Sequence, residues 1–176
     1  MSILVLPQLR PNLEADVLVY SSEFPFERKT AEASGFDLHA LVPEYRPAPG
    51  AVRRPVDAMK DKRVTWLQSL ERRCFSTGVY VAPPRGVEAQ VRPRSGASLD
   101  YGLVAVLGTC DSDYRGEIKV TVINLSRDDV MICHGDRIAQ LVFVPVILPE
   151  VRRVDSPDEL PATARGTKGF GSTGSK

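Results

Sequence analysis

The chain has 176 residues, of which 43% are hydrophobic and 26% are charged. This length and composition are typical of one folded domain, and they argue against two complete domains or a disordered chain. The formal net charge of +1 gives no overall field that would attract nucleic acid or an anionic membrane. We therefore expect neither partner, and any bound anion must be held by local groups.

The N-terminus and the cysteines indicate the compartment. Residues 1–6 lack a basic stretch, and their apolar run ends at Pro7, which is too short for a signal peptide. No apolar run reaches the length of a membrane span. Cys74, Cys110 and Cys133 form no CxxC pair, and the chain has only two histidines. These patterns favour a reduced, cytoplasmic protein without a zinc site.

An insertion is expected between Leu41 and Arg73, over about residues 46–72. Prolines at positions 43, 47, 49 and 55 disfavour regular structure in its first part. Apolar residues at 56, 59, 64, 67 and 70 then approximate the spacing of one helix face, which predicts a loop followed by a short helix. A strand over residues 63–70 is the alternative. The insertion could also bind a protein partner.

From Gly78 onward, short β-branched runs alternate with turn residues, which predicts a series of strands. The expected strands cover residues 78–81, 87–91, 103–107, 117–123, 129–133 and 137–146. Between Glu117 and Val122, polar and apolar residues alternate with period two, as a strand with one buried face requires. The series indicates an all-β fold, a jelly-roll-like antiparallel barrel or sandwich.

The last segment, residues 165–176, contains four glycines and several hydroxyl residues, and Phe170 is almost its only apolar side chain. This composition is typical of a flexible terminus. We therefore expect a single domain over residues 1–164, followed by a flexible tail. An aromatic residue between two glycines argues that the tail also has a function.

Three places carry groups that suit phosphate oxygens, namely glycine, a cation and a hydroxyl. They are Arg94-Ser95-Gly96, Lys119 on its strand, and Arg165 with the tail after it. Each place alone is weak evidence for a phosphate site, because an exposed Arg-Ser-Gly is usually a turn with a solvated charge. In addition, residues 108–116 are expected to form a hairpin loop. Its aspartates either cap the turn or supply a carboxylate base beside an aromatic ring.

Five segments, in this order, resemble the five motifs of trimeric dUTPases. They cover residues 33–40, 93–96, 108–116, 135–141 and 165–174. The resemblance extends from about Thr30 to Gly174 and leaves out the N-terminal arm and the insertion. It implies hydrolysis of dUTP to dUMP and pyrophosphate, which limits uracil incorporation into DNA and supplies dUMP for dTMP synthesis. It also implies a homotrimer whose active sites draw on three chains.

The resemblance implies catalytic roles for individual residues. Asp111 matches the aspartate that orients a water for in-line attack on the α-phosphorus, and a carboxylate suits this role because it is ionised at neutral pH. Gln140 would help to hold the water. Tyr114 matches the tyrosine that lies against deoxyribose and excludes a 2′-hydroxyl. Mg²⁺ would be carried mainly by the triphosphate, and Asp37 would contact it only through water.

The remaining implied residues bind substrate. Arg94, Ser95 and Gly96 would contact the phosphates, with Lys119 as a further candidate, and the main chain at Gly108, Thr109 and Cys110 would read uracil. In the tail, Phe170 would close over uracil, while Arg165, Gly171, Ser172 and Thr173 would contact the γ-phosphate.

Two other functions compete with this one. A dCTP deaminase of the same fold would need a glutamate base where Thr121 stands, and the zinc-deaminase pattern of His-x-Glu with Pro-Cys-x-x-Cys is absent. A regulatory protein acting through the insertion stays open as a second role. Deleting about Pro47 to Leu70 should spare hydrolysis if the insertion only recruits a partner.

Overall fold

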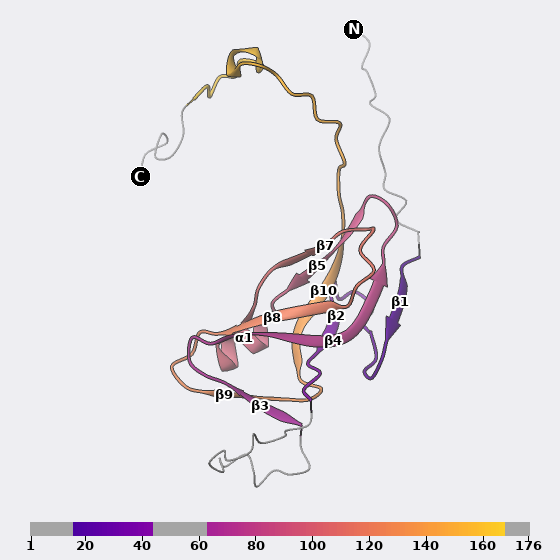
Figure 1. Cartoon of the computed structure of the whole chain (residues 1–176), viewed down its shortest axis with the longest axis vertical. Helices are drawn as coiled ribbons and strands as arrows, with labels where there is room; N and C mark the ends of the chain where they lie inside the picture. The colour runs from indigo at the N-terminus through magenta and orange to yellow at the C-terminus, as the bar shows by residue number, and fades with distance from the viewer. Residues whose placement is uncertain (1–15, 44–62, 168–176) are drawn as a thin grey trace.

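The computed structural model describes residues 16–43 and 63–167. Two four-stranded antiparallel sheets face each other, and a two-stranded sheet lies at one end of the body (Figure 1). The first sheet has the order β1 (Leu18–Ser21), β4 (Arg72–Ala82), β8 (Ile118–Asn124), β6 (Leu103–Ala105). The second has the order β2 (Phe36–His39), β10 (Arg137–Pro145), β5 (Val87–Arg92), β7 (Gly108–Cys110). The small sheet pairs β3 (Val64–Leu67) with β9 (Val130–Cys133).

The hydrophobic core lies between the two large sheets. Alternation along β8 turns Ile118, Val120 and Val122 inward, whereas Lys119 between them is exposed. These side chains belong to one continuous cluster with Leu38 and Leu141 of the second sheet. Burial of each such aliphatic side chain stabilises the fold by about 1.5–3 kcal/mol. The predicted all-β fold is confirmed, including the alternating strand.

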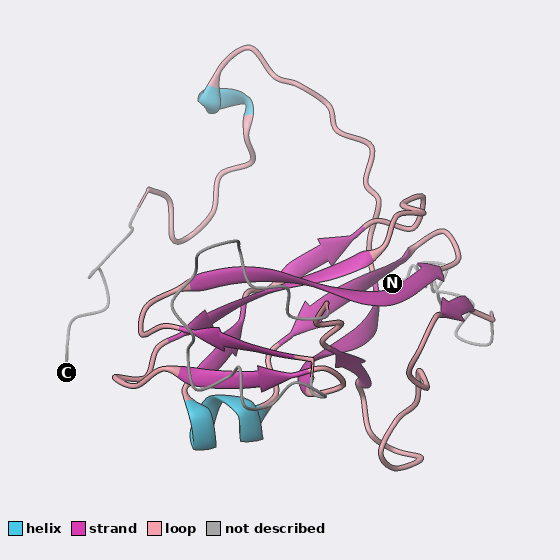
Figure 2. Ribbon diagram, turned by 60° about the horizontal axis from the view of Figure 1, so that its bottom comes forward, coloured by secondary structure: helices cyan, strands magenta, loops and turns pink. Residues whose placement is uncertain are grey.

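Helical structure is sparse in the described part of the chain. It consists of α1 (Ser95–Tyr101), which lies against the sheets, and the 3₁₀ turn η2 (Pro157–Glu159), which lies well away from them (Figure 2). The sequence did not predict α1, which is short and buries only one residue, Ala97. No described helix has the length and apolar character needed to cross a membrane.

The insertion differs from its prediction at β3. Residues 64–67 form a strand that pairs antiparallel with β9, with Val64 opposite Cys133. Val64 and Leu67 are buried, whereas Leu70 is 75% exposed, so the three do not form a helix face. A three-residue spacing is typical of a helix, whereas residues 64 and 67 of a strand point to opposite faces, so pairing with β9 outweighs the spacing here. The strand alternative is confirmed over these residues, and residues 44–62 lie outside those described.

The segment from Gly108 to Gly116 also differs from a simple hairpin loop. The strands on either side of it, β6 and β8, do pair, with Ala105 opposite Val122. Between them, however, the chain crosses to the second sheet, where β7 pairs with β5. The irregular loop therefore begins at Asp111.

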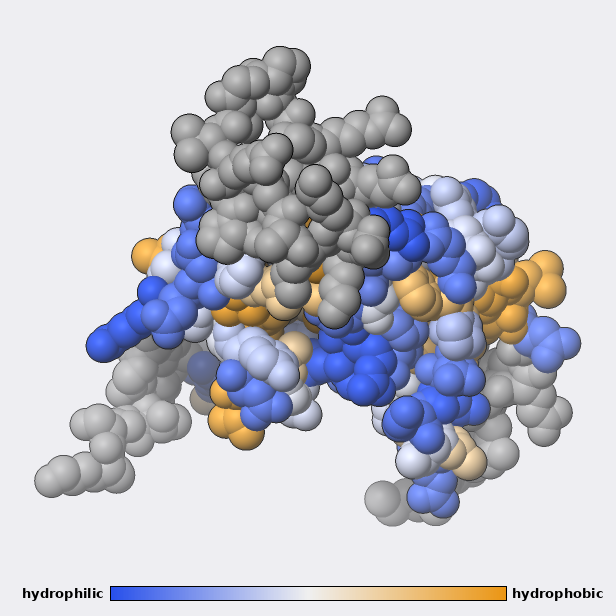
Figure 3. Space-filling model, turned by 90° about the horizontal axis from the view of Figure 1, so that it is seen from below, coloured by the Kyte–Doolittle hydropathy of each residue, from blue (hydrophilic) through white to orange (hydrophobic). Residues whose placement is uncertain are grey.

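Beyond β10 the chain leaves the body (Figure 1). The Val146 N–H still donates to the Gly86 carbonyl at 2.8 Å. Farther along, Ile147 and Val151 are 85% and 90% exposed. The body itself, seen from below, shows separate hydrophobic patches among wide hydrophilic areas (Figure 3). The extension thus presents apolar side chains without covering the core of its own chain.

Candidate active site

Three of the five motif segments meet on neighbouring strands of the second sheet. Asp37 lies on β2, Gln140 lies on β10, and Arg94 follows β5 after Pro93. The strand order β2-β10-β5 places Gln140 directly opposite Asp37 on one side and opposite Arg92 on the other. Directly opposite residues of antiparallel strands point to the same face. Segments far apart in the sequence thereby form one polar cluster.

Two guanidinium groups bracket the Asp37 carboxylate. Arg94 Nε lies 3.1 Å from Oδ1, and Arg137 Nη1 lies 3.2 Å from Oδ2. Arg94 Nη1 also donates to the Arg137 carbonyl oxygen at 3.0 Å. Ser95 and Gly96, in the first turn of α1, are exposed beside this group. Because two positive charges face one negative charge, the cluster retains a net positive charge that suits a polyphosphate.

Gln140 is fixed by two neighbours. Its Nε2 donates to the Pro93 carbonyl at 3.0 Å, immediately before Arg94. Its Oε1 lies against Gly35, where an added Cβ would come within 2.1 Å of that oxygen. Only glycine leaves space for the amide at this position. The side chain is therefore held with its carbonyl end as an acceptor.

The loop after β7 is held by its own hydrogen bonds. Arg115 Nη1 donates to the carbonyls of Ser112 and Tyr114, each at 2.8 Å. The Tyr114 hydroxyl donates to the Glu117 carbonyl at 3.2 Å, and an added Cβ on Gly116 would lie 2.2 Å from that hydroxyl. The Tyr114 ring thus lies over Gly116 and stays 45% exposed, which leaves a preformed aromatic surface for a ligand.

Asp111 opens this loop and lines a pocket of about 640 Å³. The pocket also includes Arg85, Glu88, Asp113 and Arg115. Burial, with a smaller contribution from the Asp111 and Glu88 carboxylates, raises the pKa of the Cys110 thiol above its ordinary value of 9.0. This thiol is therefore protonated at neutral pH, and Asp111 is the better candidate for the reactive group.

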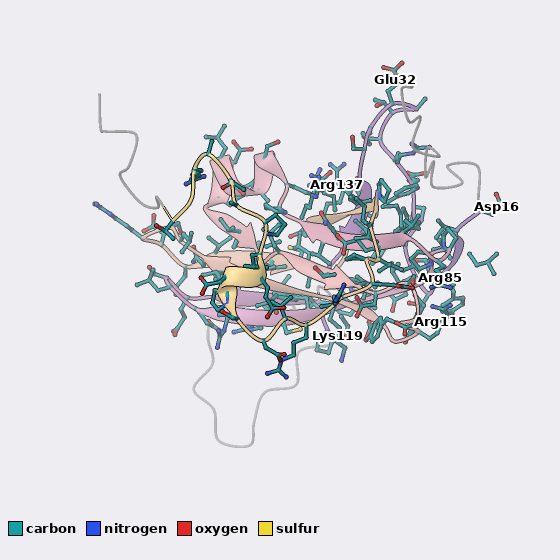
Figure 4. The ribbon with its side chains drawn as sticks, turned by 90° about the horizontal axis from the view of Figure 1, so that it is seen from above. Asp16, Glu32, Arg85, Arg115, Lys119 and Arg137 are labelled. Atoms are coloured by element: carbon teal, nitrogen blue, oxygen red, sulfur yellow. The ribbon has the colours of Figure 1, made fainter. Side chains whose placement is uncertain are left out.

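One chain does not bring Asp111 to the Arg94 cluster. Cys110 pairs with Ala89, so Asp111 lies level with Glu88, while Arg94 follows six residues later. At about 3.4 Å per residue, the two backbone positions are roughly 20 Å apart. Arg85 and Arg115, which line the pocket beside Asp111, lie near each other and apart from Arg137 (Figure 4).

Comparisons with known proteins identify the family. The dUTPase family model matches residues 59–174. A deoxyuridine 5'-triphosphate nucleotidohydrolase from Ehrlichia canis is 42% identical over 148 residues, covering 82% of this chain and 83% of its own length. The corresponding protein from Hydrogenobaculum is 50% identical over 115 residues, covering 64% and 78%. This chain belongs to the dUTPase family.

Solved dUTPase structures share the fold. The dUTPase from Staphylococcus bacteriophage 80alpha, with dUpNHpp, aligns with a TM-score of 0.66 at 23% identity and covers 90% of this chain and 98% of its own. A point mutant of the dUTPase from phage phi11 of S. aureus, described with a structural Mg(II) ion, gives 0.63 at 22% identity and covers 81% and 98%. The resemblance seen in the sequence is thereby confirmed for family and fold.

Other predicted residues of this dUTPase family member lie elsewhere. Thr109 is exposed on the edge strand β7, between the half-buried Gly108 and Cys110. Lys119 lies on the outer face of the first sheet, 4.0 Å from Glu117, and does not join the cluster on the second sheet. Arg165 belongs to the C-terminal extension. The predictions for Phe170, Gly171, Ser172 and Thr173 fall outside the described residues.

Sequence reasoning missed the part that Arg137 plays in this dUTPase-family site. Arg137 lies within the segment 135–141, which resembles a dUTPase motif, but the resemblance assigned no function to its side chain. The available signal was a basic residue in the same short motif as Gln140. Its contact with Asp37 depends on the irregular register between Arg137 and Ala139, which the sequence does not reveal.

The described residues suit a divalent cation that arrives on the substrate. Among them, no three His, Cys, Asp or Glu side chains gather closely enough to hold a metal ion. The one carboxylate in the Arg94 cluster, Asp37, is already engaged by two guanidiniums. Mg²⁺ commonly keeps several waters and is bound through substrate phosphates, which this arrangement allows.

Proposed function

We propose that the protein hydrolyses dUTP to dUMP and pyrophosphate at a site shared between copies of the chain. The separation of Asp111 from the Arg94 cluster is the observation that carries this proposal. A general base and a second residue that hold one water must each lie within hydrogen-bond reach of it, about 3 Å. Asp111 and Gln140 of one chain are too far apart for that. Asp111 of one copy must therefore meet Gln140 and Arg94 of another.

In the reaction, Asp111 accepts a proton from water while the water oxygen attacks the α-phosphorus in line. The bond between the α-phosphorus and the bridging oxygen breaks, and pyrophosphate leaves. Arg94, Ser95 and the Gly96 N–H stabilise the negative charge that grows on the departing phosphates. Gln140 Oε1 accepts a hydrogen bond from the same water. When bound, Mg²⁺ would neutralise phosphate charge, and Asp37 would help to hold it through water.

Substrate choice follows from β7 and the loop after it. Because β7 is an edge strand of the second sheet, the outer N–H and C=O groups of Gly108 to Cys110 have no strand partner in the described chain. Such groups can satisfy the polar edge of uracil. The exposed Tyr114 ring lies against deoxyribose, where a 2′-hydroxyl of UTP would collide.

The C-terminal extension completes the site as a lid. The relatives' names give dUTP as their substrate. The exposed Ile147 and Val151 favour an extension that packs on a neighbouring copy of a homotrimer. It would bring Arg165 to the γ-phosphate with Gly171, Ser172 and Thr173, and Phe170 to uracil. The enzyme would act in the cytoplasm, limiting uracil incorporation and supplying dUMP.

Pyrophosphate release tests this function. Wild-type protein with Mg²⁺ should release pyrophosphate from dUTP and not from dCTP, dTTP or UTP. Asp111→Asn should lower kcat by about 10³-fold, in the range typical of a lost general base. Asp113→Asn is the matched control, because Asp113 lines the same pocket, and it should keep most activity. An unchanged rate in Asp111→Asn, or ammonia released from dCTP, would contradict the proposal.

A further inference from the structure

Two of the three nitrogens of the Arg94 guanidinium contact groups of its own chain. Nε contacts Asp37 Oδ1 at 3.1 Å, and Nη1 donates to the Arg137 carbonyl at 3.0 Å. Among the described residues, none forms a hydrogen bond with Nη2. The side chain is 27% exposed, so a ligand can reach it, and Nη2 has donors left for that ligand.

Arg137 closes the arrangement from the other side. Its Nη1 donates to Asp37 Oδ2 at 3.2 Å, while its carbonyl accepts from Arg94. The Asp37 backbone is held in turn, because its N–H donates to the Glu27 carbonyl at 3.1 Å. Three contacts among three residues therefore fix both the position and the tilt of the Arg94 fork.

We propose that Asp37 and Arg137 are positioning residues, which hold Arg94 so that its third nitrogen is ready for the triphosphate. An arginine that is free in solvent loses rotamer freedom when it binds a ligand, whereas one already ordered loses less. The planar guanidinium also makes orientation important, since its donors point in fixed directions. The inference rests on the proposed function for its ligand, the triphosphate of dUTP.

This role differs from contact with the water shell of Mg²⁺. If Asp37 acts through Arg94, its removal weakens triphosphate binding whether or not the metal is present. If it acts through the metal, the effect disappears when Mg²⁺ is removed. Arg137 also distinguishes the two roles, because its positive charge is repelled by Mg²⁺ and it can therefore act only through Asp37 and Arg94.

The test is the affinity of the imido analogue dUpNHpp, measured by calorimetry in EDTA and again with Mg²⁺. Asp37→Asn and Arg137→Gln should each weaken binding about tenfold in both conditions, as expected for a charge-assisted contact. Neither change should weaken binding further in an Arg94→Ala background. Glu71→Gln is the matched control: it removes a carboxylate that accepts from Arg73 Nε at 3.0 Å on the first sheet, and it should leave affinity unchanged.

A loss of affinity confined to Mg²⁺, or a further loss in the Arg94→Ala background, would overturn the proposal. Thermal unfolding of each variant shows whether it is folded, and if Asp37→Asn is not, Arg137→Gln supplies the same comparison. If wild-type protein binds dUpNHpp but does not cleave dUTP, the proposed hydrolysis is contradicted. The comparison of affinities would still decide whether Asp37 and Arg137 position Arg94.

Discussion

At the scale of single residues, the candidate site depends on a close approach that only glycine permits. Gly35 lies against the amide of Gln140, whose other end is bonded to the Pro93 carbonyl. The same side chain therefore connects the segment before β2 to the residue that precedes Arg94. A shift of Gln140 would therefore have two effects. It would move the oxygen that accepts a hydrogen bond from the proposed attacking water, and it would loosen the segment that binds phosphate.

Gly35→Ala should accordingly lower kcat for dUTP by about 10²-fold, the size of effect that a 1 Å misplacement can have. The added methyl would lie 2.1 Å from Oε1 of Gln140, which must turn away. Steady-state kinetics check this, with Ser34→Ala as the control at the exposed neighbouring position. Equal kcat values for the two variants would show that the Gln140 orientation is unimportant.

The candidate residues could be predicted from the sequence, whereas their contacts could not. Arg94, Asp37 and Gln140 were proposed from the resemblance of five ordered segments to the dUTPase motifs, and the structure brings all three together. The link through Arg137 depends on strand register, which a one-residue shift would reverse. Lys119 was a candidate for a phosphate contact because of its charge, and alternation along β8 turns its side chain to the outer face of the other sheet.

At the scale of elements, period-two alternation predicted β8 well, and turn residues marked β5, β9 and β10. The β3 strand was obscured because Val64, Leu67 and Leu70 also match a helical spacing. Only its partner, β9, distinguishes the two, and long-range pairing cannot be read from a local pattern. The crossing of β7 to the second sheet was missed for the same reason.

The position of β3 changes how the insertion should be tested. The Val42 N–H donates to His134 Nδ1 at 3.2 Å, and the His134 N–H donates to the Arg63 carbonyl at 2.7 Å. Both ends of the undescribed segment therefore contact one residue and lie close together. A short linker should be able to join them.

Deleting residues 46–61 should leave the thermal unfolding temperature and dUTP hydrolysis nearly unchanged. Deleting residues 47–70 should instead destabilise the fold by more than the loss of one buried leucine, which costs about 2–5 kcal/mol, because it removes β3 with Leu67. Calorimetric unfolding and pyrophosphate release compare the two. If the shorter deletion folds but is inactive, the insertion belongs to the active site and does not serve only a partner.

At the scale of the whole molecule, the proposed function divides the active-site residues of one chain between two half-sites at different positions along the same sheet. The Arg94 half lies where β2, β10 and β5 meet, and the Asp111 half lies about six residues away along β5, at β7. A closed ring of copies joins different surfaces of neighbouring chains, so it can unite such halves repeatedly. The exposed C-terminal extension is a further segment that a neighbour could receive.

Mixing two inactive variants tests this arrangement. Asp111→Asn and Arg94→Ala should each be nearly inactive alone, yet activity should return when they are unfolded and refolded together. With random assembly into a closed ring, about one site in four receives both intact residues. Arg94→Ala mixed with Gln140→Ala is the control, and it should stay inactive, because both residues come from the same half-site of one chain. If neither mixture recovers activity, each site lies within a single chain, and Asp111 must reach the phosphates by a rearrangement of the loop after β7.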